Sequence, residues 1–383
     1  MLLEYHAELR GIISFYLKFW SLDFLSKSKW KILNIAKLLI FPLGTVILLY
    51  CSIWHLFFEM SDYSDLIDVS FTIAFIAAGF QSNLVYWIIN VYNKKKIMDI
   101  FRYFDFLINS DDSLFSDIRK KQYLKNLNQT VTIARMFLIP VTIVSVIIAM
   151  FDIYHSEFHM PLLFHFPGIP IDSILFYPIN IIVQLVLYFT CSEFLVWSDT
   201  IIMICIMYCD AELRTIKNLV SLLEDEEIVQ TKSGLLLRGI YEAHRDIDKQ
   251  ARILTESFWH VYFIKLITIM IYLCSIMFVF QSFDASLIVP FNASVVMITQ
   301  IFILCYFGQI IWNSSEVASD ALYMTKWYEM TTGDKKHLFM LMINFQNSIK
   351  IESFGFGVIS IYTFVQILKA SVSYVTILYT VFM

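Results

Sequence analysis

Seven long apolar segments constrain the fold of this chain more than any other feature. Each is long enough to cross a bilayer core of about 30 Å, for which a helix needs roughly 20 residues. Only helices or closed barrels satisfy backbone polar groups in lipid, and the alternating pattern of barrel strands is absent. The sequence therefore predicts an all-α, polytopic membrane protein with seven transmembrane helices, near residues 33–58, 67–92, 130–151, 174–197, 258–280, 293–314 and 354–382.

Composition supports lipid as the solvent for these segments. Of the 383 residues, 58% are hydrophobic and 16% are charged, whereas soluble domains contain roughly 45–50% apolar and about 25% charged residues. The formal net charge is −5, and the basic residues form no stripe of the kind that binds nucleic acid. We therefore expect membrane lipid as a partner and no nucleic acid.

The distribution of basic residues predicts the orientation in the membrane. Four segments contain 24 of the 28 lysines and arginines: 1–32, 93–125, 208–257 and 316–350. Three connections contain none: 59–66, 152–173 and 281–292. Because basic residues are retained on the cytoplasmic side, we expect a cytosolic amino terminus and an extracellular carboxyl terminus. This orientation is opposite to that of a G-protein-coupled receptor.

Helices are also expected on the cytosolic side. Residues 94–125 and 208–257 carry apolar residues at spacings of three and four, which predicts helical extensions beyond the membrane. The second of these segments is interrupted by an acidic turn from Glu224 to Glu227. The apolar stripes favour a packed intracellular layer over solvated connectors.

The sequence lacks the common signatures of catalysis. No HExxH, GxSxG, P-loop or dinucleotide motif occurs, so we expect neither an enzyme nor a cofactor. His155, His159 and His165 share one outer loop, but Pro161 and Pro167 interrupt it. Packing within the loop is a better interpretation of these histidines than a metal site.

Few ionisable residues fall within the apolar segments. Glu193 and Lys265 are the main cases. An ionisable residue inside a membrane is a candidate functional residue. Both also lie toward the inner end of a span, where a long side chain can extend to the interface. The sequence leaves both interpretations open.

The last third of the chain resembles insect odorant receptors. The run YFGQIIWNSSEVASDALYMTKWYEMTTGDKKHLFMLMINFQNSIKI, residues 306–351, is similar to the carboxyl-terminal signature of that family. The matching positions are Tyr306, Gly308, Gln309, Ser315, Ala318, Asp320, Tyr323 and Trp327. A second element, ILKASVSYVTIL at 367–378, is similar to the family pattern near the end of the chain.

Two departures indicate the branch of the family. Related gustatory receptors end on Thr-Tyr, five residues and Gln-Phe, whereas this chain has Ser373-Tyr374 and Thr380-Val381. The co-receptor of the family has a much longer insertion between the fourth and fifth spans than segment 208–257. The chain therefore resembles a ligand-specific, or tuning, odorant receptor subunit rather than the co-receptor.

The resemblance implies a function and a division of the chain. It implies a subunit of an odorant-gated, non-selective cation channel that binds a small volatile odorant. Its other implied partner is the co-receptor, in a heterotetramer at the plasma membrane of olfactory sensory neuron dendrites. Residues 1–315 would form transmembrane helices 1–6, the ligand pocket in their outer half and the cytosolic extensions. Residues 316–383 would form a cytosolic anchor segment and a pore-lining seventh helix.

The seventh segment has the pattern expected of a pore helix. Gln366, Ser373 and Thr380 are seven residues apart and share a helical face with Ile377 and Val381. A polar stripe interrupted by aliphatic residues suits a wettable pore with a hydrophobic gate. The alternative is that the hydroxyls pack against neighbouring helices.

The resemblance locates the ligand pocket among spans two, three, four and six, in the outer half of the bundle. An odorant site should be apolar and aromatic with one or two hydrogen-bonding groups. Depth and face select twelve candidates: Phe71, Thr72, Phe75, Ser145, Ile148, Ala149, Asn180, Ile181, Gln184, Met297, Gln300 and Ile301. Packing is the alternative role for each. A gustatory-type channel and, less favoured, a G-protein-coupled receptor remain alternative functions.

Overall fold

The structure, a computed structural model, is built almost entirely of helices. It describes residues 1–22, 31–59, 66–110, 115–155, 167–168, 173, 181–281 and 288–382. The α-helices are α1 (Leu2–Trp20), α2 (Lys31–Trp54), α3 (Leu66–Tyr86), α4 (Lys94–Asn109), α5 (Ser116–His155), α6 (Ile181–Ser221), α7 (Glu226–Gln281), α8 (Ile288–Tyr323), α9 (Thr332–Phe345) and α10 (Ile361–Phe382). Short π-helical segments, η1 (His55–Glu59) and η2 (Trp87–Tyr92), extend α2 and α3.

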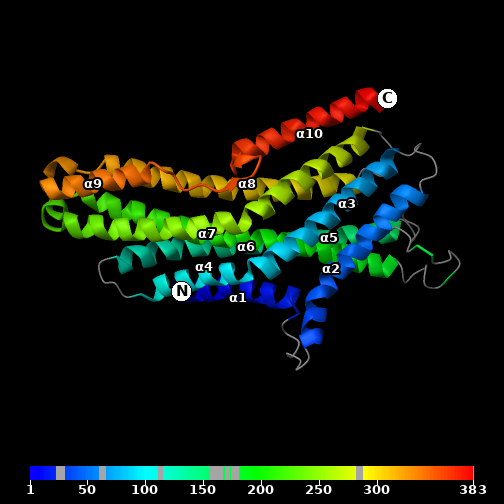
Figure 1. Cartoon of the computed structure of the whole chain (residues 1–383), viewed down its shortest axis with the longest axis horizontal. Helices are drawn as coiled ribbons and strands as arrows, with labels where there is room; N and C mark the ends of the chain where they lie inside the picture. The colour runs from blue at the N-terminus through cyan, green and yellow to red at the C-terminus, as the bar shows by residue number, and fades with distance from the viewer. Residues whose placement is uncertain are drawn as a thin grey trace.

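Four long helices, α5 to α8, run along the longest axis of the molecule (Figure 1). The hairpin between α6 and α7 and the short helix α9 lie together at one end, and the carboxyl terminus lies at the other. Helix α6 packs against α5, α7 and α8, and the most apolar stretch of the helix, within Phe189–Glu224, is almost entirely buried. The core is therefore centred on α6.

Most of the expected apolar segments form helices, which confirms the all-α prediction. Five helical stretches in the described part of the chain are long and apolar enough to cross a membrane: Ile32–Phe58, Thr72–Tyr92, Phe189–Glu224, Glu226–Met277 and Ser294–Tyr323. The expected third segment is the end of α5. Several expected spans are thus the ends of longer helices that continue into the expected cytosolic layer.

The seventh segment begins later than the sequence suggested. We expected a helix from residue 354, but α10 begins at Ile361. The preceding residues form an antiparallel hairpin of β1 (Glu352–Ser353) and β2 (Gly357–Val358). Gly355 and Gly357 have φ angles of +78° and +71°, a conformation that glycine adopts at little steric cost. The two glycines explain why a turn replaces the first part of the expected helix.

Side chains from α3 donate hydrogen bonds to backbone carbonyls of α2 near its internal proline. Pro42 lies inside α2 and has no N–H, so the carbonyl of Leu38 has no partner in its own helix. The hydroxyl of Tyr86 donates to this carbonyl at 2.8 Å. The amide of Asn83 donates to the carbonyl of Pro42 at 3.2 Å and to the hydroxyl of Thr45 at 2.6 Å. Polar residues of α3 therefore stabilise the bent helix beside it.

The expected cytosolic helices are present, with two additions. Helix α4 buries one apolar face, and a 3₁₀ turn at Leu222–Glu224 joins α6 to α7 at the acidic turn. Helix α1 was not predicted, although its buried face, which includes Leu9, Ile13 and Tyr16, follows helical spacing. Helix α9 was not predicted either, and Thr331 caps it by accepting from the backbone N–H of Asp334 at 3.2 Å.

Candidate functional site

The structure describes five of the twelve candidate ligand residues in full. Thr72 and Ile301 are fully buried, Gln300 is buried, and Phe75 and Met297 are half-buried. Asn180 lies outside the described residues. The side chains of six further candidates also lie outside the described part of the chain: Phe71, Ser145, Ile148, Ala149, Ile181 and Gln184.

Residues of α3, α7 and α8 form an apolar cluster that contains one of the candidates, Met297. Ala74 of α3 packs with Tyr272 and Ile276 of α7, and Met297 of α8 packs against this cluster. Ala74 lies between Thr72 and Phe75 in sequence, and the hydroxyl of Thr72 is buried without a hydrogen-bond partner in the described structure. The cluster provides the aromatic and aliphatic surface that an odorant site requires, and Thr72 provides a buried hydroxyl on the same helix as Ala74. Tyr272 of α7 was not among the residues expected to line the pocket, although it is an aromatic residue within an apolar segment.

Gln300 belongs to a buried polar cluster rather than to the apolar region. Its side-chain amide donates to Asp199 at 2.7 Å. The other carboxylate oxygen of Asp199 forms an ion pair with Lys265 of α7, and the ammonium of Lys265 also donates to the hydroxyl of Ser198 at 2.8 Å. Side chains from α6, α7 and α8 therefore converge at this point.

The interpretation that Lys265 reaches the membrane interface is wrong. Its side chain is 0% exposed, because Asp199 supplies a countercharge inside the bundle. An unpaired ammonium at that position would cost several kcal/mol. Glu193 is also buried, and the hydroxyl of Thr142 donates to it at 2.9 Å. The sequence analysis missed Asp199 because it lies just beyond the expected fourth span, yet an aspartate within an apolar run was a visible signal.

The candidate pore residues lie on the free side of α10. Ile367, Ser371 and Val375 are buried where α10 packs against α7 and α8. Gln366, Ser373, Ile377 and Thr380 are exposed, with Ile377 at 56%, and the side chain of Val381 lies outside the described residues. Ser373 and Thr380 donate to backbone carbonyls of their own helix, at 2.9 and 2.8 Å.

The residues of the carboxyl-terminal signature divide into two structural groups. A side chain at Gly308 would place its Cβ 2.4 Å from the carbonyl oxygen of Ile359, so glycine permits the hairpin to approach α8. The hydroxyl of Ser315 accepts from the backbone N–H of Ile349 at 2.8 Å. Asp320, Tyr323 and Trp327 are instead exposed. The signature therefore holds the end of the chain against α8 and also presents a free surface.

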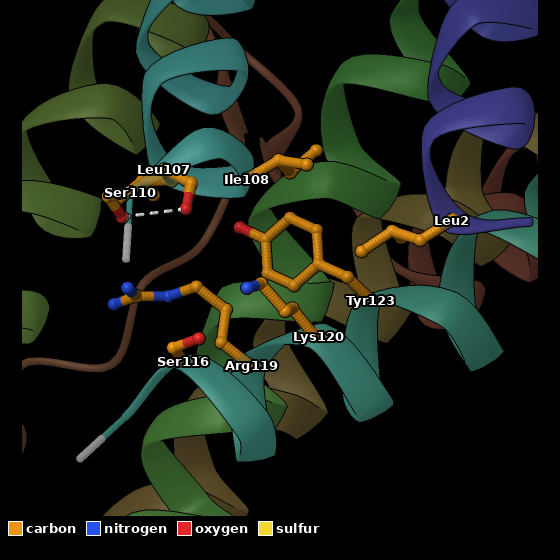
Figure 2. A pocket seen from close by; sticks show the side chains of 8 residues that line it. All are labelled: Leu2, Leu107, Ile108, Ser110, Ser116, Arg119, Lys120 and Tyr123. Carbon is orange, nitrogen blue, oxygen red and sulfur yellow. Dashed lines mark hydrogen bonds between the residues drawn. The ribbon is translucent and has the colours of Figure 1, made fainter. Parts of the chain in front are cut away.

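A small pocket lies in the expected cytosolic half and contains none of the ligand candidates. Figure 2 shows it between α1, the end of α4 and the start of α5, with Arg119, Lys120 and Tyr123 on one side. The guanidinium of Arg119 and the hydroxyl of Tyr123 each donate a hydrogen bond of 2.9 Å to the carboxylate of Glu212. Because these groups already satisfy one another and two cations line the pocket, it does not have the chemistry of an odorant site.

Helix α1 is attached to the expected cytosolic layer through His6. The imidazole Nδ1 lies 2.6 Å from the hydroxyl of Tyr208, and Nε2 lies 3.1 Å from the carboxylate of Asp105. Burial lowers the pKa of His6 below its ordinary value, and Asp105 opposes this shift only in part. A neutral His6 therefore bridges α4 and α6 at neutral pH. Of the three histidines expected in one outer loop, His159, His165 and the side chain of His155 lie outside the described residues.

The fold and these sites define a class: a helical membrane protein with a buried polar core and a partly free terminal helix. The model of the 7tm odorant receptor family matches residues 62–372. The chain belongs to this family, so the resemblance seen in the sequence is confirmed. Because the family is one of receptors, the expectation that the chain is not an enzyme is confirmed as well.

Individual relatives are more distant. Odorant receptor 85f from Drosophila melanogaster is 26% identical over 81 residues, which cover 21% of this chain and 21% of that receptor. The match thus spans about a fifth of the curated relative's length. The structure of the insect olfactory receptor OR5 from Machilis hrabei in complex with eugenol has a TM-score of 0.80 and 12% identity, with 99% of both chains covered. The structure of the same receptor described without that compound has a TM-score of 0.78 and 12% identity, with 97% and 98% covered.

Proposed function

We propose that this odorant receptor is a tuning subunit of an odorant-gated, non-selective cation channel. It assembles with a co-receptor as a heterotetramer in the plasma membrane of olfactory sensory neuron dendrites. The observation that carries the channel proposal is the free face of α10. This face leaves Gln366, Ser373, Ile377 and Thr380 without intrachain burial, and a face that mixes polar and aliphatic residues suits a water-filled path better than lipid.

The ligand is a small volatile molecule that binds in the outer half of the bundle. The similar receptor from Machilis hrabei was solved in complex with eugenol, which supports a ligand of this size. In this chain, the cluster of Ala74, Tyr272, Ile276 and Met297 provides apolar and aromatic surface, and Thr72 provides a hydroxyl. Eleven of the twelve candidates named from the sequence remain the proposed lining, and Tyr272 is added to them. Gln300 is set apart, because its amide donates to Asp199 in the buried polar cluster.

The exposed apolar side chains of segment 316–350 support assembly. Tyr323, Trp327 and Met340 are exposed, and Phe339 is 65% exposed. Apolar side chains that remain exposed after intrachain packing favour contact with another subunit. We therefore assign residues 316–350 to an anchor segment between subunits. In this division of the chain, residues 1–315 carry six membrane spans and the ligand pocket, and residues 316–383 carry the anchor segment and the pore helix.

The proposed topology has seven spans, with the amino terminus in the cytosol and the carboxyl terminus outside. It is supported by the position of basic residues around the spans. We expect an epitope tag at Met1 to be stained only after permeabilisation, and a tag after Met383 to be stained in intact cells. Surface staining of the amino-terminal tag in intact cells would exclude this topology and, with it, the proposed channel.

Dependence on the co-receptor is the direct test of function. We expect little or no current from this chain alone and a robust cation current when it is co-expressed with the co-receptor and exposed to an odorant panel. The current should persist when G-protein signalling is blocked, because the channel itself carries the response. Loss of the current under that block would favour a G-protein-coupled receptor. A large current from this chain alone would contradict the tuning assignment, and responses confined to tastants would favour a gustatory-type channel.

A further inference from the structure

Three expected span ends converge at one level of the bundle. The second expected span ends at Tyr92, the fifth begins beside Trp259, and the seventh was expected to begin at Phe354, which lies in the hairpin before α10. The side-chain amide of Asn93 donates to the carbonyl of Ser257 at 2.5 Å, which attaches the start of α4 to α7. The hydroxyl of Ser353 donates to the carbonyl of Trp259 at 3.4 Å, which brings the hairpin to the same turn of α7. This level therefore marks the expected inner border of the membrane.

Unneutralised basic groups gather at this border. Lys95 and Lys96 are exposed, and in the part of the chain that the structure describes neither forms an ion pair. Lys96 lies close to the imidazole of His260 on α7, so the start of α4 and this turn of α7 face the same region. A local surplus of positive charge without a countercharge is suited to binding an external anion.

The acids near these basic groups do not neutralise them. Asp99 binds Arg102 at 2.8 Å, and Glu352 binds Lys350 at 3.3 Å. Glu256 is exposed on α7 beside Ser257, at the level of the two lysines, and it offsets only one of their two charges. Positive charge is therefore concentrated at the border itself.

Aromatic side chains flank the basic groups. Tyr92 and Phe354 are exposed at 76% and 73%. The ring of Phe354 lies 6.4 Å from that of Trp259 and 6.1 Å from that of Phe263, centroid to centroid. Tyrosine and tryptophan are enriched at the level of lipid headgroups, where their amphipathic rings are stable. We call this surface the basic-aromatic rim; it consists of Tyr92, Lys95, Lys96, Trp259, His260 and Phe354.

We propose that the basic-aromatic rim is a binding site for anionic phospholipid headgroups of the inner leaflet. The lysines bind the phosphate and carboxylate groups, and the aromatic rings lie against the adjoining acyl region. An acidic protein partner fits less well, because the aromatic rings and the ends of three expected spans place the rim at the lipid level. The inference rests on the cytosolic orientation given under the proposed function.

The test measures lipid binding to the purified full-length chain. The chain is titrated in detergent with short-chain phosphatidylserine or phosphatidylcholine, and native mass spectrometry counts the bound lipids. Each lysine near an anionic lipid surface contributes a factor of about five in affinity. We therefore expect Lys95→Gln/Lys96→Gln to lose roughly 25-fold in phosphatidylserine affinity at low salt, with phosphatidylcholine binding unchanged. Lys95→Arg/Lys96→Arg should retain binding.

Lys217→Gln/Lys232→Gln is the matched control, because both lysines are exposed but lie on cytosolic extensions away from the rim. Equal binding of the two lipids by the unmodified chain, or an equal loss in the control, would overturn the inference. Loss of co-receptor binding in Lys95→Gln/Lys96→Gln with lipid binding intact would instead assign the rim to a protein interface. The epitope tags at the two termini distinguish failure of this inference from failure of the proposed topology. If the tags give the expected orientation but the chain does not prefer phosphatidylserine, only the lipid site is refuted.

Discussion

Replacing Lys265 with methionine should strongly destabilise the receptor. The change leaves Asp199 buried with an uncompensated negative charge, because the neutral amide of Gln300 is then the remaining side-chain donor to its carboxylate in the described structure. Breaking a buried ion pair by removing one partner costs about 3–5 kcal/mol, a large share of the roughly 5–15 kcal/mol that stabilises a typical domain. We expect a lower melting temperature in detergent and little Lys265→Met protein at the cell surface.

The double variant Asp199→Asn/Lys265→Met distinguishes the lost charge balance from lost packing. It removes both charges, keeps side chains of similar size and preserves an acceptor for Gln300, so most of the stability should return. Arg238→Met is the control, because it breaks a solvent-exposed pair with Glu242 and should change the melting temperature little. If Lys265→Met alone is as stable as the double variant, the pair does not stabilise the bundle through its charges.

Replacing Ile377 with serine should produce a leak current. If Ile377 contributes a narrow apolar ring to the closed pore, that ring excludes ions because it dewets. A hydroxyl lowers the barrier to wetting, so basal current should rise several-fold while the odorant concentration dependence changes little. Whole-cell recordings with the co-receptor, normalised to surface expression, measure both quantities.

Thr380→Lys tests the same face through charge. A cation that enters the pore would meet a like charge in surroundings of low dielectric constant, so cation permeation should fall. Val372→Ser is the matched control, because Val372 is 50% exposed but faces away from the proposed stripe, and it should leave leak and selectivity unchanged. If Ile377→Ser and Thr380→Lys both leave leak and selectivity as in the unmodified channel, α10 does not line the pore.

The helical architecture could be predicted well from the sequence because lipid imposes a simple rule. A run of about 20 apolar residues has few stable alternatives to a helix in a membrane, so the helical course of residues 33–58 and 67–92 was clear from composition alone. The start of α10 was less predictable. Gly355 and Gly357 permit the hairpin that delays the helix to Ile361, and the close approach of this segment to Gly308, which no local pattern indicates, holds the hairpin against α8.

The candidate site was predicted only in part. The sequence indicated a face of α3 and a face of α8, yet helical periodicity does not identify which faces meet, so the contribution of Tyr272 from α7 was missed. Gln300 had the right depth for a ligand residue, but its amide binds Asp199. A hydrogen-bond partner about a hundred residues away in the chain leaves no local signal.

The sequence by itself determined the class of protein, the helical membrane fold and the family, because these depend on composition, run length and local motifs. Tertiary structure alone decided how the polar residues within that apolar chain are used. It paired Lys265 with Asp199, turned Ile377 and Ser373 outward while burying Ser371, and joined the ends of three expected spans at the basic-aromatic rim. The physical reason is that a buried charge or hydroxyl is stable only with a partner, and that partner is chosen by packing between helices distant in sequence.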